Sequence, residues 1–151
     1  MPKNEKEKKE TKEERNEREE VIAELLKEHP ITDMTKFSEI DIQDKLQENA
    51  FLIVKYSELL YKEKDHYSRI LALKDKIVAE RYDYYRFNFA KELRPAEIEK
   101  YYLLKDSKVI QMNKILRRQQ WRMEFFEIAV KAFNGMGWNM KSYLQSLREG
   151  I

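Results

Sequence analysis

Glycine and proline are almost absent from the long middle of this chain. Neither occurs between Ser38 and Asn88, and the 151 residues contain only three of each. Folds with many turns depend on these residues, because tight turns use the backbone freedom of glycine or the fixed φ of proline. The sequence therefore excludes a many-turned β-sandwich, barrel or doubly wound sheet, and it predicts an all-α protein with a few long helices.

Apolar side chains in this middle segment recur at helical spacing. Positions three, four and seven residues apart form one stripe, with a second apolar band beside it. We therefore expect one helix from about Ser38 to about residue 88, with the polar run 62–66 as its one candidate break. The stripe contains Leu46, Ala50, Ile53, Leu60, Tyr67, Leu71, Val78, Tyr82 and Tyr85.

The N-terminal part of the chain predicts a tail and a short helix. Residues 1–20 are nearly all charged and cannot bury enough apolar surface to offset chain entropy, so we expect a disordered tail or a frayed helix. The apolar patch from Val21 to Leu26 predicts a two-turn helix, which His29-Pro30 ends because the residue before proline avoids helical geometry. Residues 21–151 are then expected to form a single helical domain.

A second long helix is expected in the C-terminal part. Pro95 suits the first turn of a short helix, and Asp106 or Ser107 can cap the helix that follows. Polar Gln119 alone interrupts its heptad pattern, and we expect Gly135 and Gly137 to end it before a short final helix over 138–147. The heptad seam consists of Val109, Met112, Leu116, Met123, Phe126, Val130 and Phe133.

Two long helices cannot bury all of these apolar faces against each other. The helix after Trp121 is apolar on most of its sides and needs covering on most of them. The sequence therefore predicts an elongated protomer that self-associates, with the seven residues of the heptad seam as the oligomerisation contacts.

Several classes of activity find no support in the sequence. The chain has no cysteine, which excludes disulfides, thiolate catalysis and zinc–thiolate sites. His29 and His66 have no partner near them in sequence, and Gly135-Met136-Gly137 lacks the residues of a phosphate loop. No apolar run is long enough to span a membrane. We expect a soluble, intracellular protein without enzymatic activity, metal or cofactor; an enzyme with an unrecognised acid pair is a distant alternative.

Charge is distributed unevenly along the chain. Residues 1–66 carry 13 basic and 18 acidic side chains, a net charge of −5, whereas residues 67–151 carry 17 basic and 10 acidic, a net charge of +7. A basic half can meet a polyanion such as nucleic acid. The alternatives are an uneven solvated surface or a surface by which subunits attract each other.

Cations and aromatic rings alternate between residues 74 and 94. Single strands are bound by cations that follow the phosphates and by aromatic faces that stack the bases. The alternative is that the rings belong to the core and the cations surround them. The segment contains Lys74, Lys76, Arg81, Arg86, Lys91 and Arg94, interleaved with Tyr82, Tyr84, Tyr85, Phe87 and Phe89.

Two of these cations lie between the two apolar bands and need partners. Lys74 and Arg81 are seven residues apart on one helical face, so each requires a carboxylate, such as Asp75 or Glu80 of a neighbouring subunit, or a bound anion. A second basic cluster can extend the cationic track or simply be a solvated face. It contains Arg117, Arg118 and Arg122, with Lys114 one turn earlier.

The segment Arg81-Tyr82-Asp83-Tyr84-Tyr85 resembles the UvsY recombination mediator proteins of large tailed phages. Further similarities are Tyr56-Ser57 followed by Leu59-Leu60, and Gly137-Trp138-Asn139-Met140-Lys141 after a helix that contains Trp121. The likeness covers most of residues 21–151.

The resemblance implies an all-helical protein that assembles into ring-like homo-oligomers, with heptamers described. Such proteins bind single-stranded DNA without catalysing a reaction, and they help a RecA-like recombinase displace single-strand-binding protein during DNA recombination, repair and replication. The resemblance also places the protein in the host cytoplasm and its oligomer contacts in the C-terminal helix. The competing interpretation is a structural or adaptor coiled-coil oligomer without nucleic-acid binding.

The family's DNA contact is a Lys-x-Arg before Asp-Tyr-Tyr. Arg81 matches the arginine, whereas Ala79 stands in place of the lysine, and Lys74 and Lys76 are candidates to replace it. The predicted single-stranded-DNA contacts are therefore Lys74, Lys76, Arg81, Tyr84, Tyr85 and Arg86.

Overall fold

The structure is a computed structural model that describes residues 10–150. All regular structure in this part of the chain is helical, as the sequence predicts, and it contains no strand. The helices are α1 (Lys12–Glu28), α2 (Ile31–Met34), α3 (Ile42–Asp83), α4 (Pro95–Glu97), α5 (Leu103–Lys105) and α6 (Ser107–Arg148), with π-helical segments η1 (Tyr84–Asn88) and η2 (Ile98–Tyr102).

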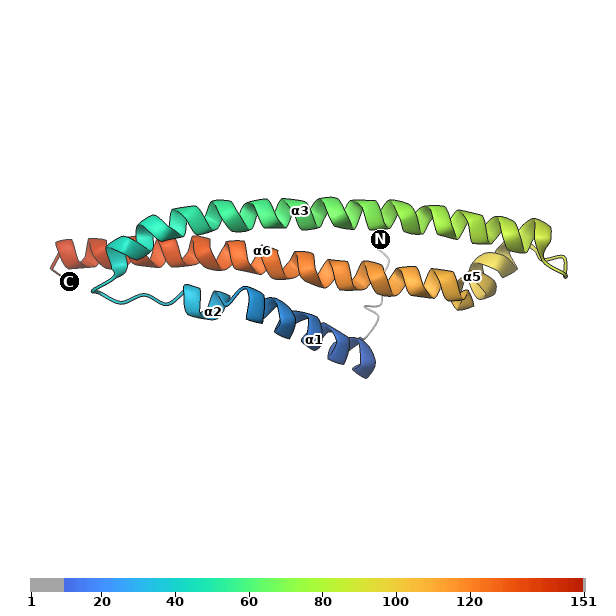
Figure 1. Ribbon diagram of the computed structural model, residues 1–151, viewed down its shortest axis with the longest axis horizontal. Helices are drawn as coiled ribbons and strands as arrows, with labels where there is room; N and C mark the ends of the chain where they lie inside the picture. Colours follow the sequence, from blue (N-terminus) through green and yellow to red (C-terminus); the bar gives the residue numbers. More distant parts are fainter. Residues whose placement is uncertain (1–9, 151) are drawn as a thin grey trace, which may run out of the picture.

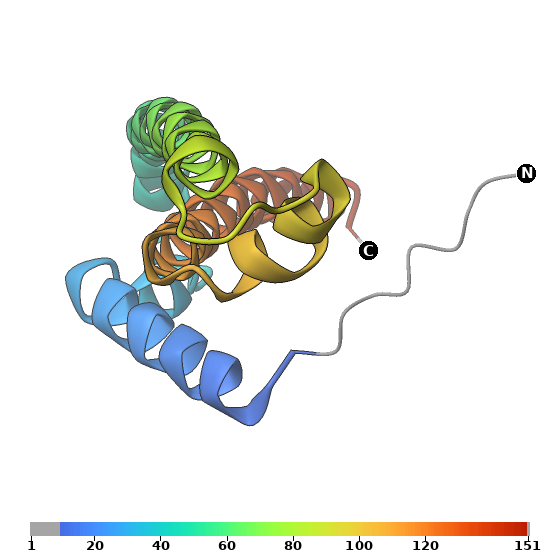
Figure 2. The ribbon, with the colours of Figure 1, turned by 90° about the vertical axis from the view of Figure 1, so that its right-hand side faces the viewer.

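Two long antiparallel helices set the shape of the molecule. Helices α3 and α6 have 42 residues each, about 63 Å at 1.5 Å per residue, and lie side by side along the long axis (Figure 1). Viewed from the end, α6 lies between α3 and α1 (Figure 2). The predicted elongated all-α protomer is confirmed, whereas its assembly into a ring stays a prediction.

The central position of α6 explains why its sequence is apolar on most faces. Its side chains pack against α3 on one side and against α1 on the other. The main core lies where all three helices meet. Its buried members are Val21, Leu25, Ile31, Ile42, Leu52, Tyr56, Trp121, Phe125, Phe126, Ala129, Phe133, Met136 and Met140.

This packing changes the role of the heptad seam. Val109, Met112, Phe126 and Phe133 are buried within the protomer, while the other three, Leu116, Met123 and Val130, are half-buried. The assignment of the first four to subunit contacts is therefore corrected: in this fold they are protomer core. A heptad pattern indicates that a helix packs against another helix, but it does not show whether that second helix belongs to the same chain.

Helix α1 begins earlier than the sequence suggests. A capping box starts it, in which the Thr11 hydroxyl accepts from the Glu14 N–H and the Glu14 carboxylate accepts from the Thr11 N–H. Glu14 also lies 2.8 Å from Arg117 of α6. Of the two expectations for residues 1–20, a disordered tail or a frayed helix, the disordered tail is wrong for residues 12–20, which are helical; residues 1–9 lie outside the described residues.

Helix α6 runs through both of its glycines, so the predicted helix end near Gly135 is wrong. Gly137 is buried, and a Cβ there would lie 2.6 Å from Asn49 Nδ2 of α3. This glycine permits a close approach of two helices rather than ending one of them. The Oδ1 atom of the buried Asn49 has no hydrogen-bond partner among residues 10–150.

The middle of the hairpin is held by a polar cluster. Buried Gln119 donates to the backbone carbonyl of Glu63 at 3.0 Å and to its carboxylate, which also pairs with Arg122 at 3.0 Å. Helix α3 passes through residues 62–66 without a break. The polar interruption of the heptad seam thus pairs with the polar run of the other long helix.

The remaining boundaries follow the sequence. Helix α1 ends at Glu28, just before His29-Pro30, and Pro95 opens α4. Asp106 caps α6 through hydrogen bonds from two backbone N–H groups. Within residues 10–150, no helix has both the length and the apolar character needed to cross a membrane.

Candidate nucleic-acid interface

The two long helices are joined by a compact end that we call the hairpin tip (residues 81–106). After η1 the chain leaves as a loop, turns at Pro95 and returns through η2 and α5 to the start of α6. A second small core holds this turn together. Its buried residues are Leu93, Ile98, Leu103 and Val109, with Val78, Tyr82, Tyr85, Phe89 and Tyr102 packed around them.

Asp106 connects both long helices at the base of the hairpin tip. Its Oδ1 accepts from the backbone N–H groups of Lys108 at 2.9 Å and Val109 at 3.2 Å. Its Oδ2 accepts from Arg81 Nε and from the Tyr85 hydroxyl, each at 2.7 Å. The side chain is only 3% exposed, so four hydrogen bonds satisfy a buried carboxylate.

These contacts determine the protonation of the group. Burial raises the pKa of Asp106, but the hydrogen bonds from Tyr85, Arg81 and the Val109 N–H together outweigh it, so the net pKa lies below its ordinary value. Burial and the hydrogen bond to Asp106 raise the pKa of the Tyr85 hydroxyl. The hydrogen bond to Asp106 raises the pKa of the Arg81 guanidinium. Asp106 and Arg81 are thus a stable ion pair.

Arg81 has its partner within the chain. Its side chain is 22% exposed, and its guanidinium carbon lies 4.3 Å from the ring centre of Tyr84. The sequence correctly indicates that this cation in an apolar stripe needs an anion, but the expected partners, a neighbouring subunit's Asp75 or Glu80 or a bound anion, are replaced by Asp106. Arg81 therefore stabilises the hairpin tip through its ion pair with Asp106.

The other predicted DNA contacts do not share one surface. Arg86 donates to the backbone carbonyl of Leu93 at 2.9 Å and so fixes the loop. Lys74 is half-buried, whereas exposed Lys76 lies 4.0 Å from Glu80. Of the six predicted contacts, the structure brings together Arg81, Tyr84 and Tyr85: the Arg81 guanidinium lies over both rings, and Arg81 and Tyr85 donate to Asp106.

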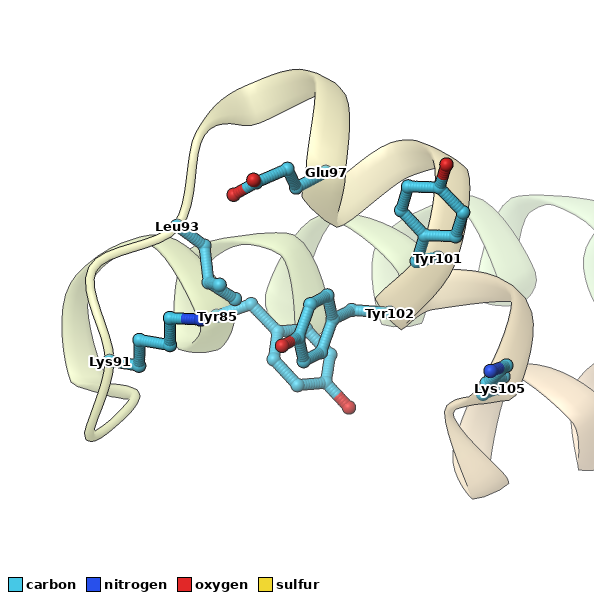
Figure 3. Close-up of a pocket in the computed structure, with 7 residues that line it drawn as sticks. All are labelled: Tyr85, Lys91, Leu93, Glu97, Tyr101, Tyr102 and Lys105. Carbon is cyan, nitrogen blue, oxygen red and sulfur yellow. The ribbon is translucent and has the colours of Figure 1, made fainter.

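A groove opens beside this cluster, with a volume of about 510 Å³. The rings of Tyr85 and Tyr102, 5.4 Å apart, form its floor, and Leu93, Glu97 and Tyr101 surround the space above them (Figure 3). We call this the tip groove; its lining residues are Tyr85, Lys91, Leu93, Glu97, Tyr101, Tyr102 and Lys105.

The tip groove combines ring faces with free cations. Lys91 lies at one end and Lys105 at the other (Figure 3), both are exposed, and neither forms an ion pair within residues 10–150. Tyr101 is 53% exposed, so its ring is accessible from solvent. Exposed rings flanked by unpaired ammonium groups can bind a planar ligand that carries negative charge.

Of the seven lining residues, only Tyr85 is among the six predicted DNA contacts, and Lys91 and Leu93 lie inside the wider segment 74–94 without being predicted as contacts. Glu97, Tyr101, Tyr102 and Lys105 come after the turn, whereas the predicted aromatic and cationic segment stopped at residue 94. The sequence indicates that a new helix starts at Pro95 but not in which direction it runs, so it could not place these residues beside Tyr85. In the structure the chain turns back, and the ring centres of Tyr85 and Tyr102 lie 5.4 Å apart.

The second basic cluster is partly neutralised within the protomer. Lys114 and Arg118 are exposed, whereas Arg117 pairs with Glu14 at 2.8 Å and Arg122 pairs with Glu63 at 3.0 Å. These arginines tie α1 and α3 to α6. They do not extend the cationic surface of the hairpin tip.

The histidines lie away from the tip groove. His29 is mostly buried, with Nδ1 3.0 Å from the Tyr56 hydroxyl and its ring against Phe126, so its surroundings are more apolar than its sequence neighbours suggest. His66 is exposed on α3. In the part of the chain that the structure describes, no group of three or more acidic or histidine side chains could hold a metal ion.

Comparison with known proteins gives this chain no relative: no protein-family model, curated protein or solved structure matches it.

Proposed function

We propose that this protein binds single-stranded DNA at its hairpin tip and acts as a recombination mediator. The observation that carries the proposal is the tip groove, in which Tyr85, Tyr101 and Tyr102 lie between Lys91 and Lys105. Stacking of bases on such rings contributes about 1–3 kcal/mol per base and depends little on sequence.

The dimensions of the tip groove suit a nucleotide. Its volume of about 510 Å³ falls in the range of small-ligand sites, roughly 300–1,000 Å³. The rings of Tyr85 and Tyr102 are inclined to each other by 52°, so a base can stack on one of them while the phosphates on either side of it reach the two lysines. A duplex keeps its bases paired and stacked, so this arrangement favours single strands.

The mediator role is the finer part of the proposal and is supported by the resemblance to the UvsY family. In this role the protein helps a RecA-like recombinase replace single-strand-binding protein on DNA, in the host cytoplasm, during recombination, repair and replication. One strand that contacts the tips of several subunits is held far more tightly than by one tip, because each later contact is intramolecular.

Self-association, which this mechanism uses, is supported by an exposed stripe on α3. Phe51, Val54 and Tyr61 are 66%, 58% and 71% exposed and recur at helical spacing on the face away from the buried residues of that helix. Exposed apolar patches of this kind are typical of protein–protein contacts. We propose that this stripe, rather than the heptad seam, contacts the next subunit in a ring-like homo-oligomer.

A structural or adaptor protein is the second candidate. The packing of Tyr82, Tyr85 and Phe89 in the second small core and the pairing of Arg81 with Asp106 favour it, since both give these residues a role in holding the fold. The two candidates differ in DNA binding: a structural or adaptor protein is not expected to bind single-stranded DNA.

Fluorescence anisotropy of a labelled thymidine oligonucleotide distinguishes them. We expect binding that weakens steeply with salt, with a log–log slope of about −0.7 for each neutralised phosphate. The double variant Tyr101→Ala/Lys105→Ala should bind about tenfold more weakly, since it loses one stacking contact and one cation.

The matched control is Lys141→Ala/Tyr143→Ala, which removes the same two residue types from the far end of α6. This control should bind like the wild type. Absence of binding by the wild type, or an equal loss in both double variants, would contradict DNA binding at the hairpin tip.

A further inference from the structure

We infer that the tip groove receives a guanine base of the bound strand and that Glu97 recognises it. This inference rests on the proposed single-stranded-DNA binding and adds the identity of the base. It starts from a feature that general strand binding does not explain, a carboxylate among the tyrosines and lysines of the groove.

The carboxylate of Glu97 is fixed in place and keeps acceptor capacity. Its Oε2 accepts a hydrogen bond from the Arg94 N–H at 3.0 Å, which holds the side chain against the first turn of α4. Its Oε1 has no hydrogen bond within residues 10–150. A carboxylate has about four acceptor positions, so most of those of Glu97 are open to a ligand.

A negative charge at this position disfavours a phosphate inside the tip groove. The lysines at its two ends suit phosphates better, because Lys91 and Lys105 are exposed and unpaired in the described chain. What enters between them must be the base, and the edge of the base that meets Glu97 must carry hydrogen-bond donors.

Guanine meets this requirement best among the four bases. Its Watson–Crick edge has two adjacent donors, the N1–H and the N2 amine, which match the two oxygens of a carboxylate. Adenine and cytosine each have one exocyclic amine beside a ring-nitrogen acceptor, and thymine has one N–H between two carbonyl groups. Unpaired bases are commonly recognised through this edge while they stack on aromatic rings.

The surroundings of Glu97 suit a planar purine. Leu93 and Glu97 lie on one side of the open space and Tyr101 on the other, above the rings of Tyr85 and Tyr102 (Figure 3). The rings supply stacking surface, and the carboxylate supplies the selective contact. A strand therefore binds through any base but more tightly where a guanine is available.

The test compares two labelled oligonucleotides that differ at one central position, thymidine or deoxyguanosine, by anisotropy with the full-length protein. We expect the guanine-containing strand to bind at least about fivefold more tightly, the lower range for a paired hydrogen-bond contact to a base. Deoxyinosine, which lacks the N2 amine, should fall between the two.

Glu97→Gln keeps an oxygen that can accept from the Arg94 N–H but removes the charge, so the variant should lose the preference for guanine. Glu99→Gln, which changes an exposed carboxylate outside the groove lining, should retain it. The ratio of the two affinities is the readout, since removal of any negative charge can raise both.

The outcomes separate the two proposals. Equal binding of both strands by the wild type, or a guanine preference that survives Glu97→Gln, overturns the role of Glu97 while single-strand binding stands. No binding of either strand overturns the proposed function itself and this inference with it.

Discussion

Arg81 Nε lies 2.7 Å from Asp106 Oδ2, and this ion pair joins the last turn of α3 to the first residue before α6. The pair is the base on which the tip groove is built, because Tyr85 donates to the same carboxylate oxygen and also forms the floor of the groove. Arg81, which the sequence predicts as a DNA contact, thus stabilises the fold of the hairpin tip.

Replacement of Arg81 by alanine should destabilise the fold strongly. It leaves the Asp106 carboxylate buried and without its counter-charge, and loss of one member of a buried pair costs about 3 kcal/mol or more. The free energy of unfolding from urea denaturation measures this effect.

The matched comparison is Arg69→Ala, which breaks an exposed pair with Asp65 at 2.9 Å. Exposed pairs contribute about 0–1 kcal/mol, so this variant should unfold almost like the wild type. Similar losses in both variants would show that Asp106 is not buried as the structure has it.

Stability should fall in acid, in part through Asp106. Folding lowers the pKa of this carboxyl group below its ordinary value of 3.8, so its contribution is complete above that value and is lost as the pH falls through the lower folded-state pKa. Asp41, whose pKa is lowered by hydrogen bonds from Ser38, acts in the same direction.

Asp106→Asn isolates the contribution of Asp106. The variant should be less stable than the wild type at neutral pH and should lose less stability between pH 7 and pH 3. Urea denaturation across this range measures both. Parallel loss of stability in the two proteins would mean that Asp106 has a similar pKa in the folded and unfolded states.

The two glycines of α6 should respond to alanine in opposite ways. At Gly135 an added Cβ meets nothing within 4 Å, so Gly135→Ala should stabilise the helix by about 0.5–1 kcal/mol. At Gly137 the Cβ would lie 2.6 Å from Asn49 Nδ2, and Gly137→Ala should destabilise the protein by about 1 kcal/mol or more. Thermal or urea unfolding of both variants shows whether each substitution raises or lowers the free energy of unfolding.

A second variant checks the cause. If Asn49 is the obstacle, Asn49→Ala should make Gly137→Ala much less harmful, and the two changes should be non-additive. Additive effects would place the clash elsewhere.

The exposed stripe of α3 should govern subunit assembly. Phe51→Ser/Tyr61→Ser changes two exposed side chains, so the protomer should keep its helix content while its mass by light scattering falls toward that of a monomer. Phe126→Ala removes a buried ring and should instead lower the free energy of unfolding by about 3–5 kcal/mol. An unchanged mass in the serine variant would contradict the assignment of the interface.

Helical periodicity and end signals were enough to predict most of the fold. As expected, α3 runs without a break through the segment that lacks glycine and proline, α1 ends just before His29-Pro30, and Asp106 caps α6. These signals are local, because they depend on residues a few positions apart.

Tertiary partners could not be predicted in the same way. Gly137 has the residue type of a helix end, and only the approach of Asn49 reveals its role. Likewise, the requirement of Arg81 for an anion follows from its position, whereas the choice of Asp106 depends on how the chain turns at Pro95. The heptad seam does pack against another helix, as predicted, but that helix is α3 of the same chain and not a helix of a neighbouring subunit.

The most direct test of the central claim is to map where a single strand touches the protein. An oligonucleotide with photoreactive bromouracil in place of thymine can be crosslinked to the full-length protein and the attached peptides identified by mass spectrometry. We predict attachment at Tyr101 or Tyr102 in the hairpin tip, lost on competition with unlabelled single strand. Attachment confined to α1 or to the C-terminal half of α6, or none at all, would contradict the account.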